Sequence, residues 1–305
     1  MTKPSEKFSR RKESCLVGTA ALAVAACIAT TCPPLHSDEP AAKEGLAADN
    51  NGLKADERKR MRDEMAARIG KVKVAPVAAP RQSPELVAKP LMSYTDEPLA
   101  IDGATLWAWA QPKHGRPVAV CKVEHYDTTR KTVSGEWLYC FASLSGELIR
   151  AKWPDGHEWT ASRPGISFRD IPDAPRPGES SAARVRQMKD LSRRFTASFE
   201  FGKGTREELR LLTQPVYSYA DEARGIIEGA VFTAAVHGTN PTALFLIELQ
   251  KERDRQVWRF SVAAMTDGGV VVQWDGKEIL NKPALYAPGK AFETWTYFFE
   301  ERLAQ

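Results

Sequence analysis

Hydrophobic residues in this chain repeat with two periods, and the same succession of periods occurs twice. Two stripes recur at helical spacing among charged residues and predict amphipathic helices with one face docked on the protein. The stripes consist of Leu53, Met61, Met65 and Ile69, and of Val185, Met188, Leu191 and Phe195. A two-residue alternation follows each stripe, at residues 71–74 and 198–201, and predicts a half-buried strand.

Five short apolar segments follow in each half of the chain, separated by short turns. Asp155-Gly156 and Asp275-Gly276 are hairpin signals. Consecutive strands joined in this way predict an antiparallel meander rather than a parallel sheet. The predicted strands are 104–111, 117–126, 136–143, 147–153 and 157–161 in the first half, and 229–237, 242–250, 257–265, 269–274 and 277–282 in the second.

The two halves also share a sequence motif. Residues 90–97 read PLMSYTDE and residues 215–222 read PVYSYADE, and aligning Ser93 with Ser218 gives an offset of 125. Self-similarity of this kind is the signature of a repeated unit. We therefore predict an α+β fold: a tandem duplication of a unit in which one helix packs on a curved antiparallel β-meander. The order of elements is similar to the cystatin-like or NTF2-like arrangement, an analogy that implies no function.

Composition divides the chain into five segments. We predict an export signal over residues 1–27, a flexible tether over 28–52, repeat unit 1 over 53–172, a linker over 173–180 and repeat unit 2 over 181–305. The length of 305 residues agrees with two domains of about 150 residues each.

The first segment has the pattern of a secretory signal. Arg10-Arg11-Lys12 precede an Ala-rich apolar run that ends in small residues. Two cleavage sites fit: an ordinary signal-peptidase site at Ala23-Val24-Ala25, or a lipobox in which Cys27 would be lipidated. An uncleaved N-terminal anchor is the third alternative. We expect an exported protein of the periplasm or cell envelope that meets the membrane only through this segment.

Charge argues against a nucleic-acid partner. Residues 1–26 carry five basic and two acidic side chains, so the rest of the chain holds only +1 of the formal net charge of +4. A near-neutral body lacks the basic patch that nucleic-acid binding requires. The remaining partners to expect are a protein or a small-molecule ligand in the cell envelope.

Three segments of the second half carry a resemblance to known sequences. RLLTQPVYSY at 210–219, EGA at 228–230 and AMTDGG at 264–269 resemble uncharacterised secreted proteins of planctomycete bacteria. The resemblance covers about residues 180–282. It implies export and a globular body, and it supplies no activity, cofactor or site residue.

No catalytic or metal-binding motif emerges from the sequence. The five histidines show no metal-ligand spacing, and neither a nucleophile elbow nor a phosphate-binding loop is present. The repeated acid pairs Asp96-Glu97 and Asp221-Glu222 are more typical of turns closed by side-chain-to-backbone hydrogen bonds than of a cation site. We predict no cofactor and no metal.

Cys121 and Cys140 flank a predicted hairpin and are a candidate disulfide, since an exported protein permits oxidation. The alternation of side chains between the two faces of a strand favours two separate thiols. In the second half, the counterparts Phe245 and Ser261 fall on opposite faces, and facing residues of paired strands must share a face.

Aromatic residues give the clearest difference between the halves. Trp107 and Trp109 share one side of a predicted strand, where we align them with Thr233 and Ala235. Together with His114 in the next loop they are the candidate ligand-binding surface, although large aromatics are also typical core residues. The sequence thus favours a non-catalytic binding or structural module. The alternative is a hydrolase or other small-molecule enzyme with a pocket between or inside the repeat units.

Overall fold

The computed structural model describes residues 55–112, 114–130, 133, 135–201, 204–284 and 293–300. The predicted export signal, the tether and the lipidation candidate Cys27 lie outside the described residues. In chain order the elements are α1 (Ala55–Ile69), β1 (Lys73–Pro76), β2 (Glu85–Leu86), β3 (Met92–Asp96), η1 (Glu97–Leu99), β4 (Ile101–Ala110), β5 (Pro117–Tyr126), β6 (Trp137–Ser143), β7 (Ile149–Lys152), β8 (Glu158–Thr160), β9 (Arg169–Asp170), α2 (Ser181–Ser192), β10 (Phe195–Phe201), β11 (Thr205–Glu208), β12 (Arg210–Asp221), η2 (Glu222–Arg224), β13 (Ile226–Val236), β14 (Asn240–Glu252), β15 (Arg255–Ala264), β16 (Gly269–Trp274), β17 (Lys277–Lys282) and β18 (Trp295–Phe299).

The predicted α+β class is wrong, because the protein is mostly antiparallel β-sheet. Strands make up 52% of the described residues and helices 14%. The five predicted strands of each half do not form one meander on which a helix packs. After the third strand the chain leaves the sheet, and β7 pairs with β1 while β16 pairs with β10. Periodicity predicted where the strands lie, but sheet membership depends on partners distant in the sequence.

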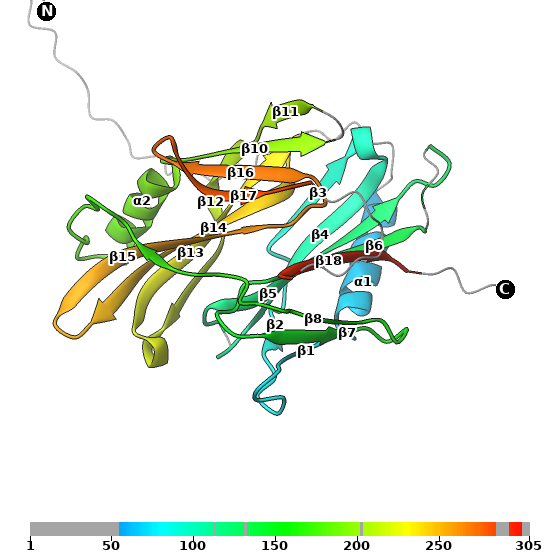
Figure 1. Ribbon diagram of the computed structural model, residues 1–305. Helices are drawn as coiled ribbons and strands as arrows, with labels where there is room; N and C mark the ends of the chain where they lie inside the picture. The colour runs from blue at the N-terminus through cyan, green and yellow to red at the C-terminus, as the bar shows by residue number, and fades with distance from the viewer. Residues whose placement is uncertain are drawn as a thin grey trace, which may run out of the picture. The chain divides into compact units, whose positions relative to one another are not determined.

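Two central sheets and two smaller ones result (Figure 1). The first central sheet has the order β18-β6-β5-β4-β2, with β3 also paired to β4, and the second has the order β12-β13-β14-β15-β9. The smaller sheets are β1-β7-β8 and β11-β10-β16-β17.

The central sheets pair their strands in the same sequential order. β3–β4–β5–β6 and β12–β13–β14–β15 are both antiparallel, with Tyr94 opposite Ala104 and Tyr219 opposite Gly229. Asp96 and Asp221 each cap a 3-10 turn, accepting a hydrogen bond from the backbone N–H of Leu99 and Arg224. The acid pairs therefore lie at turns.

The register corrects one alignment made from the sequence. Tyr94 opposite Ala104 and Tyr219 opposite Gly229 match residue 104 with 229, so Trp107 corresponds to Phe232 and not to Thr233. Because side chains alternate between the two faces of a strand, a slip of one residue exchanges those faces. Trp107 and Phe232 are both buried core residues, so the expected aromatic difference is smaller at this position.

Strand pairing crosses the predicted linker twice. β9 precedes the linker but pairs with β15. β18, drawn in red in Figure 1, comes from the C-terminal end of the chain and pairs with β6. The boundary at residues 173–180 stays a prediction, and each central sheet takes one edge strand from the other side of it.

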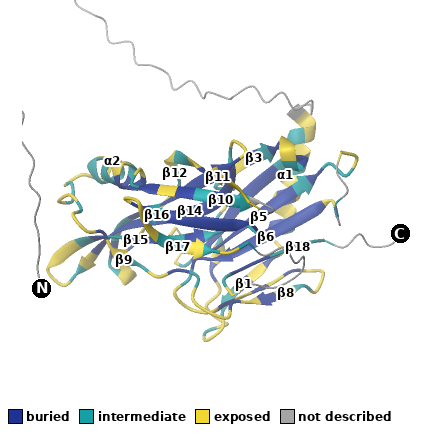
Figure 2. Cartoon of the chain, turned by 45° about the horizontal axis from the view of Figure 1, so that its top comes forward, coloured by how far each residue is buried: buried dark blue, intermediate teal, exposed yellow. Residues whose placement is uncertain are grey.

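Hydrophobic side chains form three clusters. The inner cluster contains residues of both central sheets, among them Leu106, Val120, Val231 and Leu244. The outer faces pack separately, one with α1 and β1-β7-β8 and the other with α2 and β10-β16-β17. β5, β6, β14 and β16 are consequently buried along most of their length (Figure 2).

A Gly165→Ala substitution tests the close approach of the segment after β8 to the end of β6. An added Cβ would lie 2.1 Å from the backbone oxygen of Ser143, and backbone atoms yield little. We expect the free energy of unfolding to fall by about 1–3 kcal/mol in denaturant titration. Gly146→Ala is the control, because its Cβ would meet nothing within 4 Å. Equal losses in both variants would contradict this packing.

Candidate functional site

A pocket of about 480 Å³ opens at the inner faces of the central sheets. We call it the central pocket. Its polar side chains come from β5, from β11, from the start of β14 and the turn before it, and from the loop before β16, while β6 and β18 supply much of its apolar wall. The polar members are Lys122, Glu124, Thr205, Glu207, His237, Asn240, Thr242, Thr266 and Asp267, and apolar or aromatic members include Tyr126, Leu138, Met265, Trp295 and Phe299.

Lys122 is the central polar group of the pocket. The residue is only 5% exposed, which is unusual for lysine. Its Nζ donates a hydrogen bond to Asn240 Oδ1 at 2.9 Å and lies 3.7 Å from Glu124 Oε1. A buried ammonium needs such partners because its desolvation is costly. The lysine thus joins β5 of the first central sheet to β14 of the second.

Glu124 is held by two tyrosines. Tyr94 donates to its Oε1 at 2.5 Å, and Tyr126 donates to its Oε2 at 3.3 Å. Burial, followed by the charge of Glu124, raises the pKa of both phenols well above the usual range. Both tyrosines therefore stay protonated and act as hydrogen-bond donors.

Asp96 connects the pocket to its rim. Asn240 Nδ2 donates to Asp96 Oδ2 at 2.7 Å, and His237 Nδ1 lies 3.2 Å from Asp96 Oδ1. His237 Nε2 in turn lies 4.0 Å from Glu207 on β11. His237 has a positive φ of 44°, a conformation that is uncommon outside glycine but that histidine, like asparagine and aspartate, adopts more often than other residues. The turn between β13 and β14 thus directs an imidazole toward the acid that caps η1.

The second central sheet contains a related cluster without the lysine. Tyr219 donates to Glu248 Oε1 at 2.7 Å, as Tyr94 does to Glu124. The register of β14 on β13 places Leu246 where β5 has Lys122. Arg116, which occupies the position of Asn240, donates to both oxygens of Glu248 at 2.6 and 2.5 Å. The Arg116 side chain is longer than that of Asn240, so its guanidinium reaches the carboxylate of Glu248 directly.

The chemistry available in the central pocket is hydrogen bonding and charge pairing. Burial raises the pKa of the Cys140 thiol to about 12, so this pocket cysteine is not an activated nucleophile. The Thr242 hydroxyl donates to the backbone carbonyl of Asn240. Within the described ranges, no group of three or more His, Cys, Asp or Glu side chains is arranged to hold a metal ion.

The tryptophans singled out from the sequence are not at this site. Trp107 and Trp109 are 4% and 2% exposed and belong to the outer cluster with Met65 and Ile69 of α1. The Trp107 indole N–H donates to Thr105 Oγ1 at 2.8 Å. The two residues form no exposed platform, because α1 covers this face of β4. His114 is exposed in the turn before β5, with a positive φ of 64°.

The candidate disulfide is not formed. Cys121 and Cys140 are free and buried, and Cys121 pairs in register with Phe141 while Lys122 faces Cys140. The two sulfurs lie on opposite faces of the sheet, Cys121 in the outer cluster and Cys140 in the inner one. Alternation of side chains along β5 and β6 separates them.

The residues that form the central pocket were missed in the sequence. One signal was available: Lys122 interrupts the apolar run from Val118 to Val123, in a strand with both faces buried. Its contact with Asn240 joins residues 118 positions apart and leaves no periodic trace. Glu124 and Glu248 occupy matching positions but lie outside the motif that made the repeat visible.

Comparison of the chain with protein-family models, with curated proteins and with solved structures gives no match. The resemblance to planctomycete secreted proteins stays a prediction. Among the described residues, no helix combines the length and apolar character needed to cross a membrane.

A Tyr94→Phe substitution tests the buried network. It removes the 2.5 Å hydrogen bond to Glu124, and bonds to charged groups contribute about 1.5–3 kcal/mol. We expect a loss of this size in the free energy of unfolding. Tyr217→Phe is the control, because its hydroxyl is 3.5 Å from the Gly115 carbonyl and should lose less than about 1 kcal/mol. If Tyr94→Phe lost no more than the control, the network would not contribute to stability.

His125 provides a prediction of pH dependence. Its ring lies 3.4 Å from Asp102 and 3.0 Å from Glu136. Burial alone would lower the pKa of His125, but hydrogen bonds to the two acids raise it overall. The contribution of protonated His125 to the free energy of unfolding is therefore complete below the pKa of about 6.5 that histidine has in the unfolded chain. It is lost as pH rises through the higher pKa of His125 in the folded protein.

We expect His125→Gln to lower the free energy of unfolding more at pH 5 than at pH 9. Urea titrations of both proteins at the two pH values measure the difference. His114→Gln is the control, since its side chain is exposed in a turn. A pH-independent loss would show that the imidazolium contributes nothing beyond packing.

Proposed function

We propose that this protein is a non-catalytic binding protein and that the central pocket holds a small ligand with an apolar body and a hydrogen-bond acceptor. The observation that carries the proposal is the buried Lys122 in a pocket whose other walls are largely apolar. Ligand sites generally combine apolar walls with a few polar groups that fix orientation.

The size of the central pocket agrees with this function. Its volume of about 480 Å³ falls within the range of about 300–1,000 Å³ that small-molecule sites occupy. Aromatic and aliphatic side chains from both central sheets line it, including Tyr126, Leu138 and Met265. Such walls favour an apolar ligand body of modest size.

The hydrogen bonds inside the pocket favour an acceptor on the ligand. Glu124 receives bonds from two tyrosines, and Asp96 receives one from Asn240. Lys122 directs one of its three ammonium hydrogens to Asn240 and approaches Glu124. The remaining donor capacity suits a carbonyl, hydroxyl or carboxylate of the ligand.

Hydrolysis is the competing function, since the pocket lies between the central sheets, where an enzyme site was expected as the alternative. A hydrolase needs a nucleophile paired with a base. Cys140 and Thr242 lack such a base among their hydrogen-bond partners: the thiol is 3.9 Å from the Met265 carbonyl, and the hydroxyl faces the Asn240 carbonyl. The Thr266 hydroxyl has a carboxylate partner, Asp267 Oδ1, but at 3.4 Å this contact is long for a hydroxyl hydrogen bond. Binding without turnover is therefore the function that this geometry favours.

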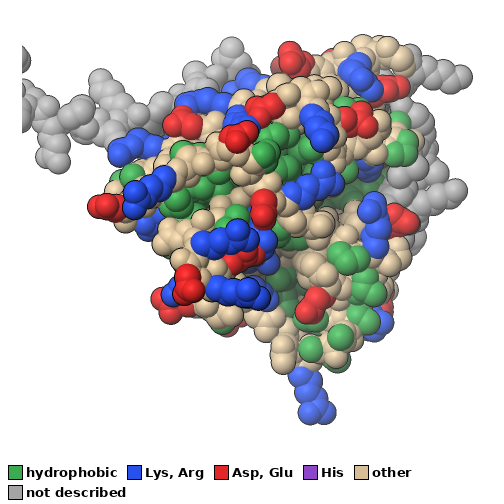
Figure 3. All heavy atoms as spheres, turned by 60° about the vertical axis from the view of Figure 1, so that its left-hand side comes forward, with side chains coloured by type: hydrophobic (Ala, Val, Ile, Leu, Met, Phe, Trp, Pro, Cys, Tyr) green, Lys and Arg blue, Asp and Glu red, His purple; other side chains and the backbone are tan. Residues whose placement is uncertain are grey.

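The proposed ligand reaches the protein outside the cytoplasm. The signal pattern at residues 1–27 supports export to the periplasm or cell envelope. Nucleic acid is not the proposed partner. Acidic and basic side chains are interspersed over the face shown in Figure 3, where the described residues form no patch of a single sign.

Two probes of similar shape test this function. Acetophenone carries a carbonyl acceptor and ethylbenzene does not. In ligand-observed NMR titrations we expect acetophenone to bind the full chain more tightly, and Lys122→Met to reduce that preference roughly tenfold, because it removes a charged donor. Thr205→Trp, at the exposed edge of the pocket, should weaken both probes.

Lys277→Met on β17 is the matched control, since that lysine is exposed and does not line the pocket. Equal binding of both probes to the original protein, or an unchanged preference in Lys122→Met, would contradict the proposal. Conversion of an ester probe by the original protein but not by Lys122→Met would favour the enzyme instead.

A further inference from the structure

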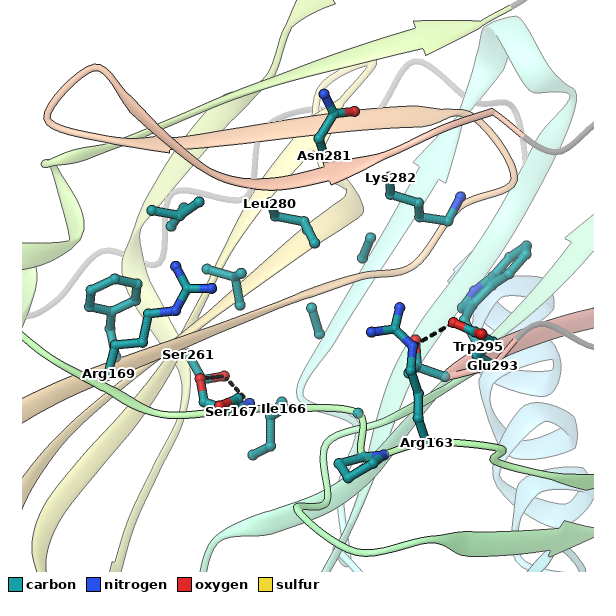
Figure 4. A pocket seen from close by; sticks show the side chains of 18 of the residues that line it. Arg163, Ile166, Ser167, Arg169, Ser261, Leu280, Asn281, Lys282, Glu293 and Trp295 are labelled. Atoms are coloured by element: carbon teal, nitrogen blue, oxygen red, sulfur yellow. Dashed lines mark hydrogen bonds and ion pairs between the residues drawn. The ribbon is translucent and has the colours of Figure 1, made fainter.

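A second pocket, of about 470 Å³, lies beside residues 163–169, the segment after β8 that leads toward the predicted linker (Figure 4). We call it the linker pocket. Four segments far apart in the sequence form it: residues 163–169, the end of β15, the end of β17 and residues 293–295 at the start of β18. Trp295 also lines the central pocket, so the two cavities share this residue as part of their walls.

Positive charge predominates around the linker pocket. Arg163, Arg169 and Lys282 line it, and Glu293 is the one acidic side chain among its described lining residues. Glu293 is paired with Arg163 at 2.5 Å, which offsets one of the three cations. Two positive charges therefore remain without an acid in the lining.

The cations approach from different sides. In Figure 4, Arg169 extends from one side of the pocket and Arg163 from the other, while Asn281 points away. Lys282 lies near Trp295, with its Nζ 5.4 Å from the centre of the indole ring. Its ammonium donates to the Gly268 carbonyl at 2.9 Å. Burial lowers the pKa of Lys282, so an anion beside it would restore stabilisation that the lysine lost when it left water.

Most of the remaining lining residues are apolar. Ile166 and Phe260 are buried in their hydrophobic clusters, and Val262 and Leu280 are half-buried. Ala263, Ala264 and Ile279 also line the pocket. An ion alone would leave this surface in contact with water, whereas an apolar chain would cover it.

We propose that the linker pocket binds an anionic single-chain amphiphile, with its carboxylate attracted by the positive charge of Arg163, Arg169 and Lys282 and its hydrocarbon chain against Ile166, Val262 and Leu280. This site is separate from the central pocket and does not depend on the ligand assigned there. Charge complementarity selects the headgroup, and burial of apolar area provides the affinity for the chain.

Calorimetric titration of the full chain with monomeric dodecanoate tests the proposal. Dodecyltrimethylammonium has the same chain with the opposite charge, and acetate has the carboxylate without the chain. We expect saturable binding of dodecanoate, at least tenfold weaker binding of the cationic amphiphile, and no measurable binding of acetate. Equal binding of the two amphiphiles would overturn the charge selection, and binding of acetate as tight as dodecanoate would overturn the role of the chain.

Substitutions of the lining residues test whether dodecanoate binds in the linker pocket. Arg169→Gln and Lys282→Gln should each weaken dodecanoate binding roughly threefold to tenfold, because each removes one positive charge from the lining. Glu293→Gln should tighten binding, since it frees Arg163. Arg255→Gln is the matched control, as an exposed arginine at the far end of β15.

Thermal unfolding of each variant shows whether it keeps the fold. Unchanged affinity in folded Arg169→Gln and Glu293→Gln would overturn the assignment. If dodecanoate binding were lost in Lys122→Met but kept in Arg169→Gln, the amphiphile would occupy the central pocket. That result would refute the second site and leave the proposed binding function standing.

Discussion

Burial of both faces of each central sheet is the constraint on which this structure depends. The inner faces share one hydrophobic cluster, while each outer face is covered by a helix and a smaller sheet. A polar side chain buried on an inner face needs a hydrogen-bond partner, and several of these partners lie on the opposite sheet. Arg116 meets Glu248 in this way, and Lys122 meets Asn240. The same requirement that closes the core therefore fixes how the two halves fit together.

The central pocket arises where the halves differ at corresponding positions. On one side the long Arg116 reaches across to Glu248 and Tyr219 supports the same carboxylate. On the other side the shorter Asn240 bridges Asp96 and Lys122. A buried lysine and unfilled space thus occur together on one side only. This difference in side-chain length makes the polar networks on the two sides unequal in a nearly symmetric strand arrangement.

Local features of the sequence predicted local features of the structure. Ser180 caps α2 by accepting a hydrogen bond from the Ala183 N–H, and Asp96 caps η1, as residues of these types commonly do. Most strand positions followed from alternation and turn residues. The pairing of strands into sheets could not be predicted in this way, because β18 pairs with β6 and β9 pairs with β15, and local periodicity does not relate these distant segments. The alignment of the two halves from the sequence was shifted by one residue at Trp107. It therefore matched a core tryptophan with Thr233 and suggested a surface difference between the halves.

The most direct test of this account is a double-mutant cycle between Arg116 and Glu248, since their ion pair joins the halves. Arg116→Met, Glu248→Gln and the double variant are compared with the original protein by urea unfolding. The account predicts a coupling free energy of about 1–3 kcal/mol, the size expected for a buried, bidentate contact. A coupling of zero within error, with all variants folded, would show that the two residues do not meet and that the inner faces are not packed as described.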